Sequence, residues 1–269
     1  MDVKLTMLGT GSAMALECFN TCFIIEDKGE LFMVDGGGGN MLFSRIEKAG
    51  YDWKDIKHIF VTHKHMDHLF GIIWMVRMIT QHMQRGQYDG EAYIYASDEV
   101  IDIIMDFASR LLLQREIAFI GKRLHLVEIK DGQAFSVLGK CCTAFDIRST
   151  KTKQFGFTMS YAEGKRLTCC GDEPCSESGF KYAEGSEWLL HEAFCLYSQA
   201  DIFSPYEKHH STVKDACELA ERAGVKNLLL YHTEDRNISN RKRLYTEEGS
   251  RYYSGNLIIP DDLEVIEII

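Results

Sequence analysis

The segment THKHMDH, residues 62–68, contains three histidines and an aspartate within six residues. It follows directly on the apolar run HIFVT at residues 58–62, a pattern typical of a buried strand. In a tight turn at the end of such a strand, the two histidines of the HxH pair can point one way and the following Asp-His pair another. Imidazole and carboxylate groups are ligands for Zn²⁺, Mn²⁺ and iron. The segment therefore predicts two adjacent metal ions with coordination positions left open for water.

Short apolar runs and helical patterns alternate on both sides of this segment. Strands interleaved with helices at both ends of a chain suggest two sheets packed face to face, with helices outside. Only three prolines occur, and no flexible linker or internal repeat is visible. We therefore predict a single domain over residues 1–269. The predicted strands are Val3–Leu8, Cys22–Glu26, Leu31–Val34, His58–Thr62, Ala92–Tyr95, a series between Arg123 and Cys170, Trp188–Leu190, Asn227–Leu230 and Leu263–Ile268. The predicted helices are Met41–Ala49, Gly71–Met83, Asp98 to about Gln114 and Thr212–Ala223.

Composition excludes several classes of protein. With 269 residues, 45% of them hydrophobic and 26% charged, the chain can bury a large globular core. Its formal net charge of −10 repels the phosphate backbone of nucleic acids, so an RNA substrate would require a local basic patch. No apolar run approaches the ~20 residues that span a bilayer, and the start of the sequence lacks the pattern of a signal peptide. The nine cysteines form no CxxC pair, and their odd number argues against a disulfide framework. We expect a soluble cytoplasmic protein with reduced thiols.

Further motifs follow one another in order along nearly the whole chain. Together with the histidine segment, they make the sequence resemble the metallo-β-lactamase fold hydrolases, and within these the tRNA 3′-processing endonucleases (tRNase Z) and their phosphodiesterase relatives. The resemblance implies an αββα sandwich, which agrees with the pattern of strands and helices. The motifs are LGTGSA (8–13) with Asn20-Thr21, VDGGGG (34–39), CCGDEP (169–174), HEAF (191–194), HST (210–212) and LLLYHTEDR (228–236).

The resemblance also implies a ligand set for two divalent ions. Asp172 would bridge the two ions, although an aspartate after a glycine is also common in an ordinary turn. Zn²⁺ is the expected metal, with Mn²⁺ or iron as alternatives, and one or two ions would be bound. The other implied ligands are His63 and His65 for the first ion, and Asp67, His68 and His232 for the second.

The implied metals determine the chemistry. Two divalent ions that share a water lower its pKa from the bulk value toward ~7, so a hydroxide becomes available as nucleophile near neutral pH. It can attack phosphorus or a carbonyl carbon while the ions stabilise the developing charge. Asp67 is a candidate catalytic residue as well as a ligand, and Glu192 is a candidate to orient a neighbouring histidine. His210, in the HST motif, is the candidate proton donor to the leaving oxygen. The alternative for His210 is a polar residue at a helix start, with Ser211 or Thr212 as the cap.

One position departs from the family pattern. The family has another metal-binding histidine at the end of a strand before a glycine-aromatic pair, and in the stretch FDIRSTKTKQFGF (145–157) the matching residue is Arg148. A guanidinium is not deprotonated in proteins and cannot bind a metal. Because a cation beside two metal ions requires an anion between them, Arg148 is a candidate phosphate contact. The alternatives are that Arg148 points into solvent, or that Asp146 is the ligand after a register shift of two.

The substrate expected from these features is a small anionic phosphodiester. The tRNA-processing members carry a protruding Gly/Pro-rich arm that grips tRNA, and no stretch of that kind occurs in this sequence. We predict a metal-dependent hydrolase, and specifically a phosphodiesterase. The alternatives are a tRNA or RNA endonuclease, a thioester or lactam hydrolase, and a non-catalytic metal-binding or sensing protein. No membrane partner is expected, and Trp74, Met75, Met78 and Met83 suggest either a core or the face of a homodimer.

Overall fold

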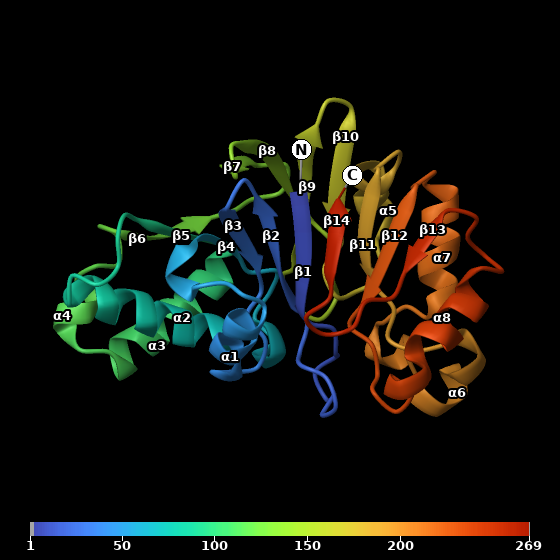
Figure 1. Ribbon diagram of the computed structural model, residues 1–269, viewed down its shortest axis with the longest axis horizontal. Coiled ribbons are helices and arrows are strands. Elements are labelled where there is room, and N and C mark those ends of the chain that lie inside the picture. Colours follow the sequence, from blue (N-terminus) through green and yellow to red (C-terminus); the bar gives the residue numbers. More distant parts are fainter. Residues whose placement is uncertain (1–2, 269) are drawn as a thin grey trace. The chain divides into compact units, whose positions relative to one another are not determined.

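The computed structural model describes residues 3–268 and divides into two compact units. The first unit contains residues 3–9, Thr21–Lys130 and 263–268, and the second contains Thr10–Asn20 and Asp131–Asp262. Within the described residues, each unit is built on one seven-stranded sheet (Figure 1). The expectation of a single domain over 1–269 stays a prediction, and each unit is described by itself.

The first unit combines antiparallel and parallel strands in one sheet. Its strands are β1 (Val3–Gly9), β2 (Cys22–Asp27), β3 (Glu30–Val34), β4 (Ile56–Phe60), β5 (Ala92–Ala96), β6 (Leu124–Glu128) and β14 (Val265–Ile268). Its helices are α1 (Met41–Lys48), η1 (Trp53–Asp55), α2 (Met66–Gln84), α3 (Asp98–Leu111) and α4 (Gln114–Ile117). The order is β14-β1-β2-β3-β4-β5-β6, antiparallel as far as β3 and parallel from β3 to β6. Parallel neighbours require a crossover connection, and α1, α2 and α3 lie in these crossovers.

Helix α2 begins earlier than the sequence pattern indicates. The prediction placed its start at Gly71, whereas the helix begins at Met66. Asp67 and His68 are therefore buried in its first turn, and the prediction that they lie in a turn after the strand is wrong. The segment looked like a loop because its polar residues face the interior at this point. The buried apolar residues of α2 recur every three to four positions, as in an amphipathic helix: Leu69, Ile72, Met75, Val76, Ile79 and Met83.

Two glycines allow α2 to contact the loop that follows β3. A Cβ atom on Gly71 would lie 1.8 Å from the carbonyl oxygen of Gly36, which is a backbone atom and cannot rotate away. The Gly71 N–H donates to the Gly37 carbonyl (2.9 Å), and the Gly36 N–H donates to the His68 carbonyl (2.9 Å). The close approach therefore fixes the start of α2 against the loop that contains Asp35.

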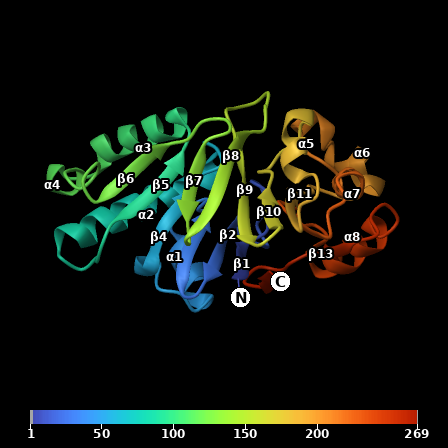
Figure 2. The same ribbon diagram turned by 90° about the horizontal axis from the view of Figure 1, so that it is seen from above.

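The second unit also joins an antiparallel part and a parallel part in one sheet. Its strands are β7 (Ala134–Val137), β8 (Lys140–Asp146), β9 (Phe155–Ala162), β10 (Lys165–Cys169), β11 (Trp188–Glu192), β12 (Asn227–Tyr231) and β13 (Asn256–Ile258). Its helices are α5 (Glu177–Ala183), η2 (Tyr197–Gln199), α6 (Ala200–Phe203), η3 (Tyr206–Lys208), α7 (Val213–Arg222), η4 (Ile238–Asn240) and α8 (Arg241–Gly249). The order is β13-β12-β11-β10-β9-β8-β7, and Figure 2 shows β8 and β9 side by side in the antiparallel part. Strands β10 to β13 are parallel.

Helix α7 agrees closely with the prediction of a helix over Thr212–Ala223. Thr212 is its N-cap, and a capping box forms because the Asp215 N–H donates to the Thr212 hydroxyl while the Thr212 N–H donates to the Asp215 carboxylate. Its apolar face joins a buried cluster with β11 and β12 that includes Leu189, Ala216 and Leu230. The sequence prediction omitted α5 and α8. In α8 the residues are mostly polar, so its sequence carries no helical periodicity.

The ends of the parallel strands carry the polar residues of both units. Asp35 follows β3, and the histidine segment follows β4 in the first unit. In the second unit, Asp172 follows β10 and His232 follows β12. In open α/β sheets, ligands bind beyond the carboxyl ends of the strands. Each sheet thus places its candidate ligands at the strand ends where α/β proteins commonly bind their ligands.

Two surface features bear on the sequence predictions. The sequence suggested that the Trp and Met residues of α2 form either a core or a dimer face. Met75 and Met83 are buried in the core, whereas Trp74 keeps 38% of its surface exposed. Within residues 3–268, no helix combines the length and the apolar character that crossing a membrane requires.

Candidate metal centre

Four predicted ligands converge in the first unit, at the junction between β4 and α2. His65 is the N-cap residue of α2, and Asp67 and His68 lie in its first turn. The His63 Nε2 atom lies 2.8 Å from the His65 Nδ1 atom, and the His68 Nε2 atom lies 3.3 Å from an Asp67 carboxylate oxygen. The rings of His63 and His68 are 4.3 Å apart between centroids. The first unit therefore brings together all the ligands that the sequence predicts for it.

Asp35 orients this cluster, and sequence reasoning missed it. Its carboxylate accepts hydrogen bonds from the Thr62 N–H (2.8 Å) and the Thr62 hydroxyl (2.7 Å). The same carboxylate lies 2.7 Å from the His68 Nδ1 atom, and both side chains are buried. A carboxylate on one ring nitrogen fixes the histidine tautomer and leaves the other nitrogen for a metal. The only sequence signal was an aspartate in the glycine turn after an apolar strand, where Asp35 has a φ of 57°.

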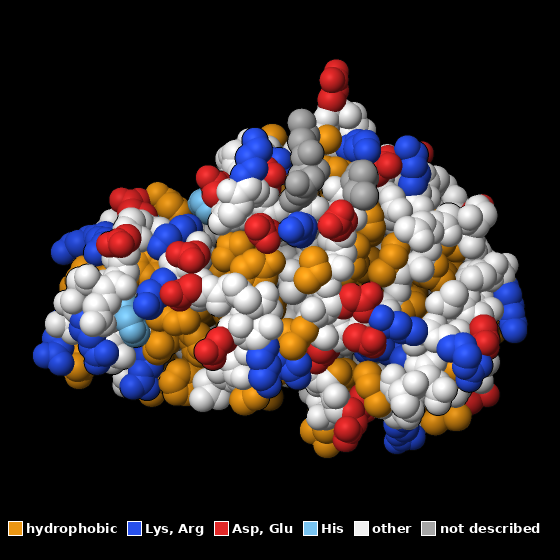
Figure 3. Space-filling view, in the orientation of Figure 1, with side chains coloured by type: hydrophobic (Ala, Val, Ile, Leu, Met, Phe, Trp, Pro, Cys, Tyr) orange, Lys and Arg blue, Asp and Glu red, His pale blue; other side chains and the backbone are white. Residues whose placement is uncertain are grey.

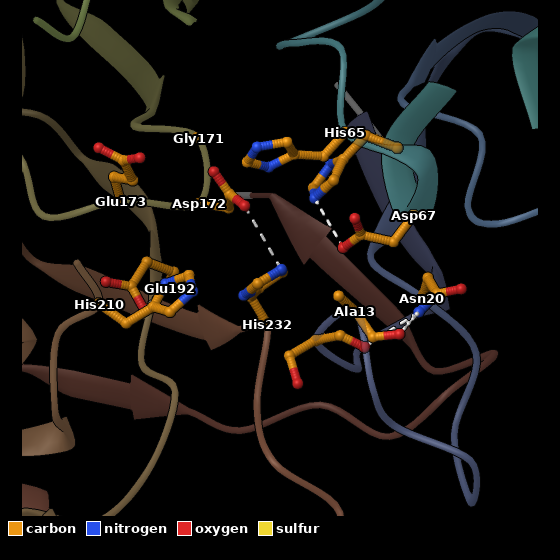
Figure 4. A network of polar contacts seen from close by, with 12 residues as sticks. Ala13, Asn20, His65, Asp67, Gly171, Asp172, Glu173, Glu192, His210 and His232 are labelled. Atoms are coloured by element: carbon orange, nitrogen blue, oxygen red, sulfur yellow. Dashed lines mark hydrogen bonds and ion pairs between the residues drawn. The ribbon is translucent and has the colours of Figure 1, made fainter. Parts of the chain in front are cut away.

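Asp172 and His232 meet in the second unit. Figure 4 shows the two side chains facing each other, and His232 Nε2 lies 3.5 Å from an Asp172 carboxylate oxygen. His232 stands directly after β12 with a φ of 58°, a backbone conformation that turns the chain at the end of the strand. The buried amide of Gln154 donates a hydrogen bond to Asp172 and fixes its carboxylate. Gln154 also escaped the sequence prediction, because a glutamine in a lysine-rich loop carries no signal of such a role.

Glu192 and His210 form a second acid–base pair beside His232. His210 Nδ1 lies 3.6 Å from the buried Glu192 carboxylate, which also accepts a hydrogen bond from the Ser211 N–H. Burial alone would lower the pKa of His210, but the contact with Glu192 and the charges of Glu192 and Asp172 raise it above its ordinary value. His210 is therefore held in the protonated form over a wider pH range than a free histidine.

The donor sets fit a divalent cation. In each unit, imidazole nitrogens and carboxylate oxygens lie 2.8–3.5 Å from one another, and both are atom types that bind divalent cations. In the second unit, one ligand atom each from Glu192, His210 and His232 also lie within 4.8 Å of one another. These three side chains are close enough together to hold a metal ion.

Arg148 lies on the surface of the second unit and is paired with two carboxylates. Its guanidinium is 2.9 Å from Asp131 and 3.3 Å from Asp146, and its side chain is 59% exposed. Asp146 also accepts a hydrogen bond from the Arg148 N–H (2.7 Å). Arg148 lines a pocket of about 280 Å³ together with Tyr206 and His210. The structure therefore places Arg148 in the same pocket as the candidate proton donor.

Comparisons with known proteins agree on one fold. A family profile described as Anti-Pycsar protein Apyc1 matches residues 3–249. The Ribonuclease Z of Streptococcus gordonii is 26% identical over 314 aligned residues, which cover 99% of this chain and 100% of that protein. The metallo-β-lactamase fold protein YhfI from Bacillus subtilis has a TM-score of 0.80 at 16% identity, with all of both chains covered. The short form of human tRNase Z has a TM-score of 0.75 at 20% identity and 99% coverage of both chains. The metallo-β-lactamase fold and the tRNase Z-like branch expected from the sequence are thus confirmed.

Proposed function

This chain belongs to the family described as Anti-Pycsar protein Apyc1, and from that premise we propose that it is a phosphodiesterase acting on a small anionic substrate. It is a metal-dependent hydrolase with the metallo-β-lactamase fold, as its similarity to Ribonuclease Z proteins and to hydrolases of this fold indicates. The proposal adds the class of bond, the size of the substrate and the residues that act.

The metals of this proposal would be held by six side chains. Zn²⁺ is the first choice because imidazole and carboxylate are its usual ligands in hydrolases. Bound divalent ions supply a nucleophilic hydroxide near neutral pH and stabilise the negative charge that develops on the substrate. The proposed ligands are His63, His65, Asp67 and His68 from the first unit, and Asp172 and His232 from the second.

His210 is the proposed proton donor to the leaving oxygen. The observation that carries the proposal is its position, since it is paired with the buried carboxylate of Glu192 and also lines the pocket of about 280 Å³. A histidine whose pKa is raised keeps its proton to a higher pH than a free imidazole does, which favours its role as a donor to an alkoxide. The same pocket contains Arg148, whose proposed role is a contact to the phosphate, in exchange with its carboxylate partners.

A small phosphodiester fits this chain better than RNA. Small-molecule sites have volumes of roughly 300–1,000 Å³, and the pocket of about 280 Å³ beside His210 falls just below that range, which suits a small substrate. The chain carries a net charge of −10, and Figure 3 shows Lys and Arg side chains interspersed with Asp and Glu on the face drawn. The alignment with the Streptococcus gordonii Ribonuclease Z spans 314 positions, so that protein contains stretches that this chain lacks.

The test compares three substrates under one set of metal conditions. We expect hydrolysis of bis(p-nitrophenyl) phosphate to exceed hydrolysis of a chromogenic lactam, and precursor tRNA to be trimmed poorly at physiological salt. The variant His210→Ala should lose most of the phosphodiesterase activity, whereas the control His125→Ala, on β6, should keep it. Efficient, position-specific trimming of precursor tRNA would favour the endonuclease that the Ribonuclease Z relatives suggest. Lactam hydrolysis at the higher rate would contradict both proposals.

Elemental analysis tests the metal ligands separately from activity. Purified wild-type protein should retain at least one transition metal through dialysis. The double variant His68→Ala, Asp172→Ala should lose most of it, because it removes a ligand from each unit. A metal content equal to that of the wild type would show that the metal, and with it the nucleophile, has been assigned to the wrong residues.

The compartment and the oligomeric state complete the proposal. All nine cysteines lie within the described residues as free thiols, which supports a reducing compartment such as the cytoplasm. A homodimer remains our prediction from the apolar residues of α2, and sedimentation equilibrium would test it.

A further inference from the structure

Helices α2 and α3 of the first unit contact each other, as Figure 1 shows, and an apolar pocket lies between them at the surface. The pocket has a volume of about 200 Å³. Neither the proposed metal ligands nor His210 and Arg148 line it. Both helices contribute large apolar side chains to its walls, namely Phe70, Ile73 and Trp74 from α2 and Ile104, Phe107 and Leu111 from α3.

Several of these apolar side chains stay in contact with solvent. Trp74 keeps 38% of its surface exposed, and Leu111 keeps 66%. Phe70 and Phe107 are half-buried and meet edge to face, with their ring centroids 6.0 Å apart. Water against such walls finds few hydrogen-bond partners, so an apolar group that replaces it is bound by the hydrophobic effect. The walls therefore favour an apolar ligand, and an aromatic ring in particular, because the phenylalanine and tryptophan rings can stack on it or meet its edge.

Of the described residues that line the pocket, Arg77 alone carries a charge. It is exposed on α2, three residues after Trp74, and its guanidinium carbon lies 5.4 Å from the centre of the Trp74 ring. This cation–π contact keeps the positive charge beside the apolar walls. Within residues 3–268, no carboxylate forms an ion pair with Arg77, whereas Arg110 on α3 pairs with Asp106 at 3.1 Å. The charge of Arg77 is therefore available to an anion from outside the chain.

We propose that this pocket binds a small arylalkyl carboxylate, with the ring against the apolar walls and the carboxylate paired with Arg77. The volume sets the size of the ligand. An apolar cavity of about 150 Å³ binds benzene, so a pocket of about 200 Å³ accepts a phenyl ring with part of a short chain. A guanidinium presents parallel N–H donors that match the two oxygens of a carboxylate. The proposed phosphodiesterase function does not require this ligand, so the two proposals are independent.

A second copy of the chain is the other occupant that a partly exposed apolar surface could take. Two features favour the small ligand. The apolar surface is concave, with the volume of a small molecule, and its single charge is a cation without a carboxylate partner in the described chain. In a dimer whose two-fold axis passes through this surface, Arg77 would face the same arginine of the other copy, and the two like charges would repel.

Three probes with one tail and three different head groups test the pocket. They are 4-phenylbutyrate, 4-phenylbutanol and 4-phenylbutylamine, which are negative, neutral and positive at neutral pH. Titration calorimetry of the purified full chain should give a dissociation constant below about 1 mM for the carboxylate. The carboxylate should bind about two- to fivefold more tightly than the alcohol, as expected for an exposed ion pair, and the amine should bind most weakly. Added salt should reduce this difference.

Arg77→Gln and a matched control separate the contribution of the head group from that of the tail. Arg77→Gln should bind the carboxylate no more tightly than the alcohol, and its affinity for the alcohol should equal that of the wild type. The control Arg85→Gln removes the same charge from an exposed arginine at the end of α2, outside the pocket, and should keep the preference for the carboxylate. Binding should also change the fluorescence of Trp74, one of three tryptophans, so Trp74→Phe should lose most of this change and still bind the probe.

Three results would contradict the proposal. If the carboxylate shows no saturable binding, the pocket does not take such a ligand. If the three head groups bind equally, or if Arg77→Gln keeps the preference, the ligand does not pair with Arg77. If the probes do not bind and the chain sediments as a dimer that Leu111→Glu dissociates, a second copy covers the pocket. A protein without phosphodiesterase activity would count against the proposed function and leave these binding results unchanged.

Discussion

The variant Asp35→Asn tests whether one buried carboxylate prepares His68 for metal binding. The Asp35 carboxylate accepts from the Thr62 N–H, the Thr62 hydroxyl and the His68 Nδ1 atom, at 2.7–2.8 Å. Asparagine has nearly the same shape, but one of its two terminal atoms is a donor. If the amide oxygen keeps the bond to the Thr62 N–H, the amide nitrogen faces Thr62 and His68. The Thr62 hydroxyl can turn and accept, whereas His68 must move its proton to Nε2.

The proton on Nε2 then blocks the nitrogen that we propose as the metal ligand. Loss of such an orienting partner lowers metal affinity by about 10- to 100-fold, which corresponds to about 1.4–2.8 kcal/mol of binding free energy. Mismatched buried hydrogen bonds also cost about 1–3 kcal/mol of folding stability. For a chain of this size, that loss lowers the melting temperature by roughly 2–4 °C per kcal/mol.

Zinc competition with a chromogenic chelator measures the affinity, and a thermal melt of metal-free protein measures the stability. The control Asp102→Asn changes an exposed aspartate on α3 and should alter neither quantity. If Asp35→Asn binds zinc as tightly as the control, Asp35 does not set the tautomer of His68.

Three further predictions follow from the same geometry. Gly71→Ala should destabilise the fold by about 1–3 kcal/mol or more, because its Cβ would meet the Gly36 carbonyl at 1.8 Å, and a denaturant melt measures the loss. Glu192→Gln should lower the pKa of His210, so the fall of kcat/KM at alkaline pH should begin at a lower pH than in the wild type; an unshifted profile would exclude His210 as the proton donor. Arg148→His should bind more zinc per chain than Arg148→Gln in a stoichiometric titration, if this position faces the first metal.

The sequence predicts most of the fold because its strands and amphipathic helices carry clear periodicity. Strands β2, β3 and β12 and helices α1 and α7 lie within one or two residues of their predicted ends. The start of α2 was missed because polar residues turned inward look like a loop. Helix α8 was missed because it is polar over most of its surface, with Arg241 buried by long-range hydrogen bonds to Thr10 and Thr233. Such elements depend on contacts that no local pattern encodes.

The residues of the candidate site also fall into two groups, those that the sequence predicts and those that only the structure reveals. Residues that could bind metal themselves stand in recognisable motifs, so the histidine segment, Asp172 and His232 could be named from the sequence. Residues that act by orienting another side chain could not, because their partners are distant in the chain. Asp35 contacts His68 and Gln154 contacts Asp172 only after the strands between them have paired. A sequence motif therefore points to candidate metal ligands, whereas the side chains that orient those candidates are found only in the fold.

Arg148 shows how the structure changes the meaning of a residue that the sequence had already singled out. From the sequence alone, a cation in place of a ligand calls for an anionic substrate, but in the structure Asp131 and Asp146 already provide two negative charges against its one positive charge. Removing the arginine would leave both carboxylates without their cation, which attracts metal ions and repels an anionic substrate whatever residue replaces it. Arg148→His and Arg148→Gln share this electrostatic change, and only histidine adds a ligand. A difference in zinc stoichiometry between them therefore isolates the ligand, whereas an equal rise in both would show that Arg148 acts through its charge alone.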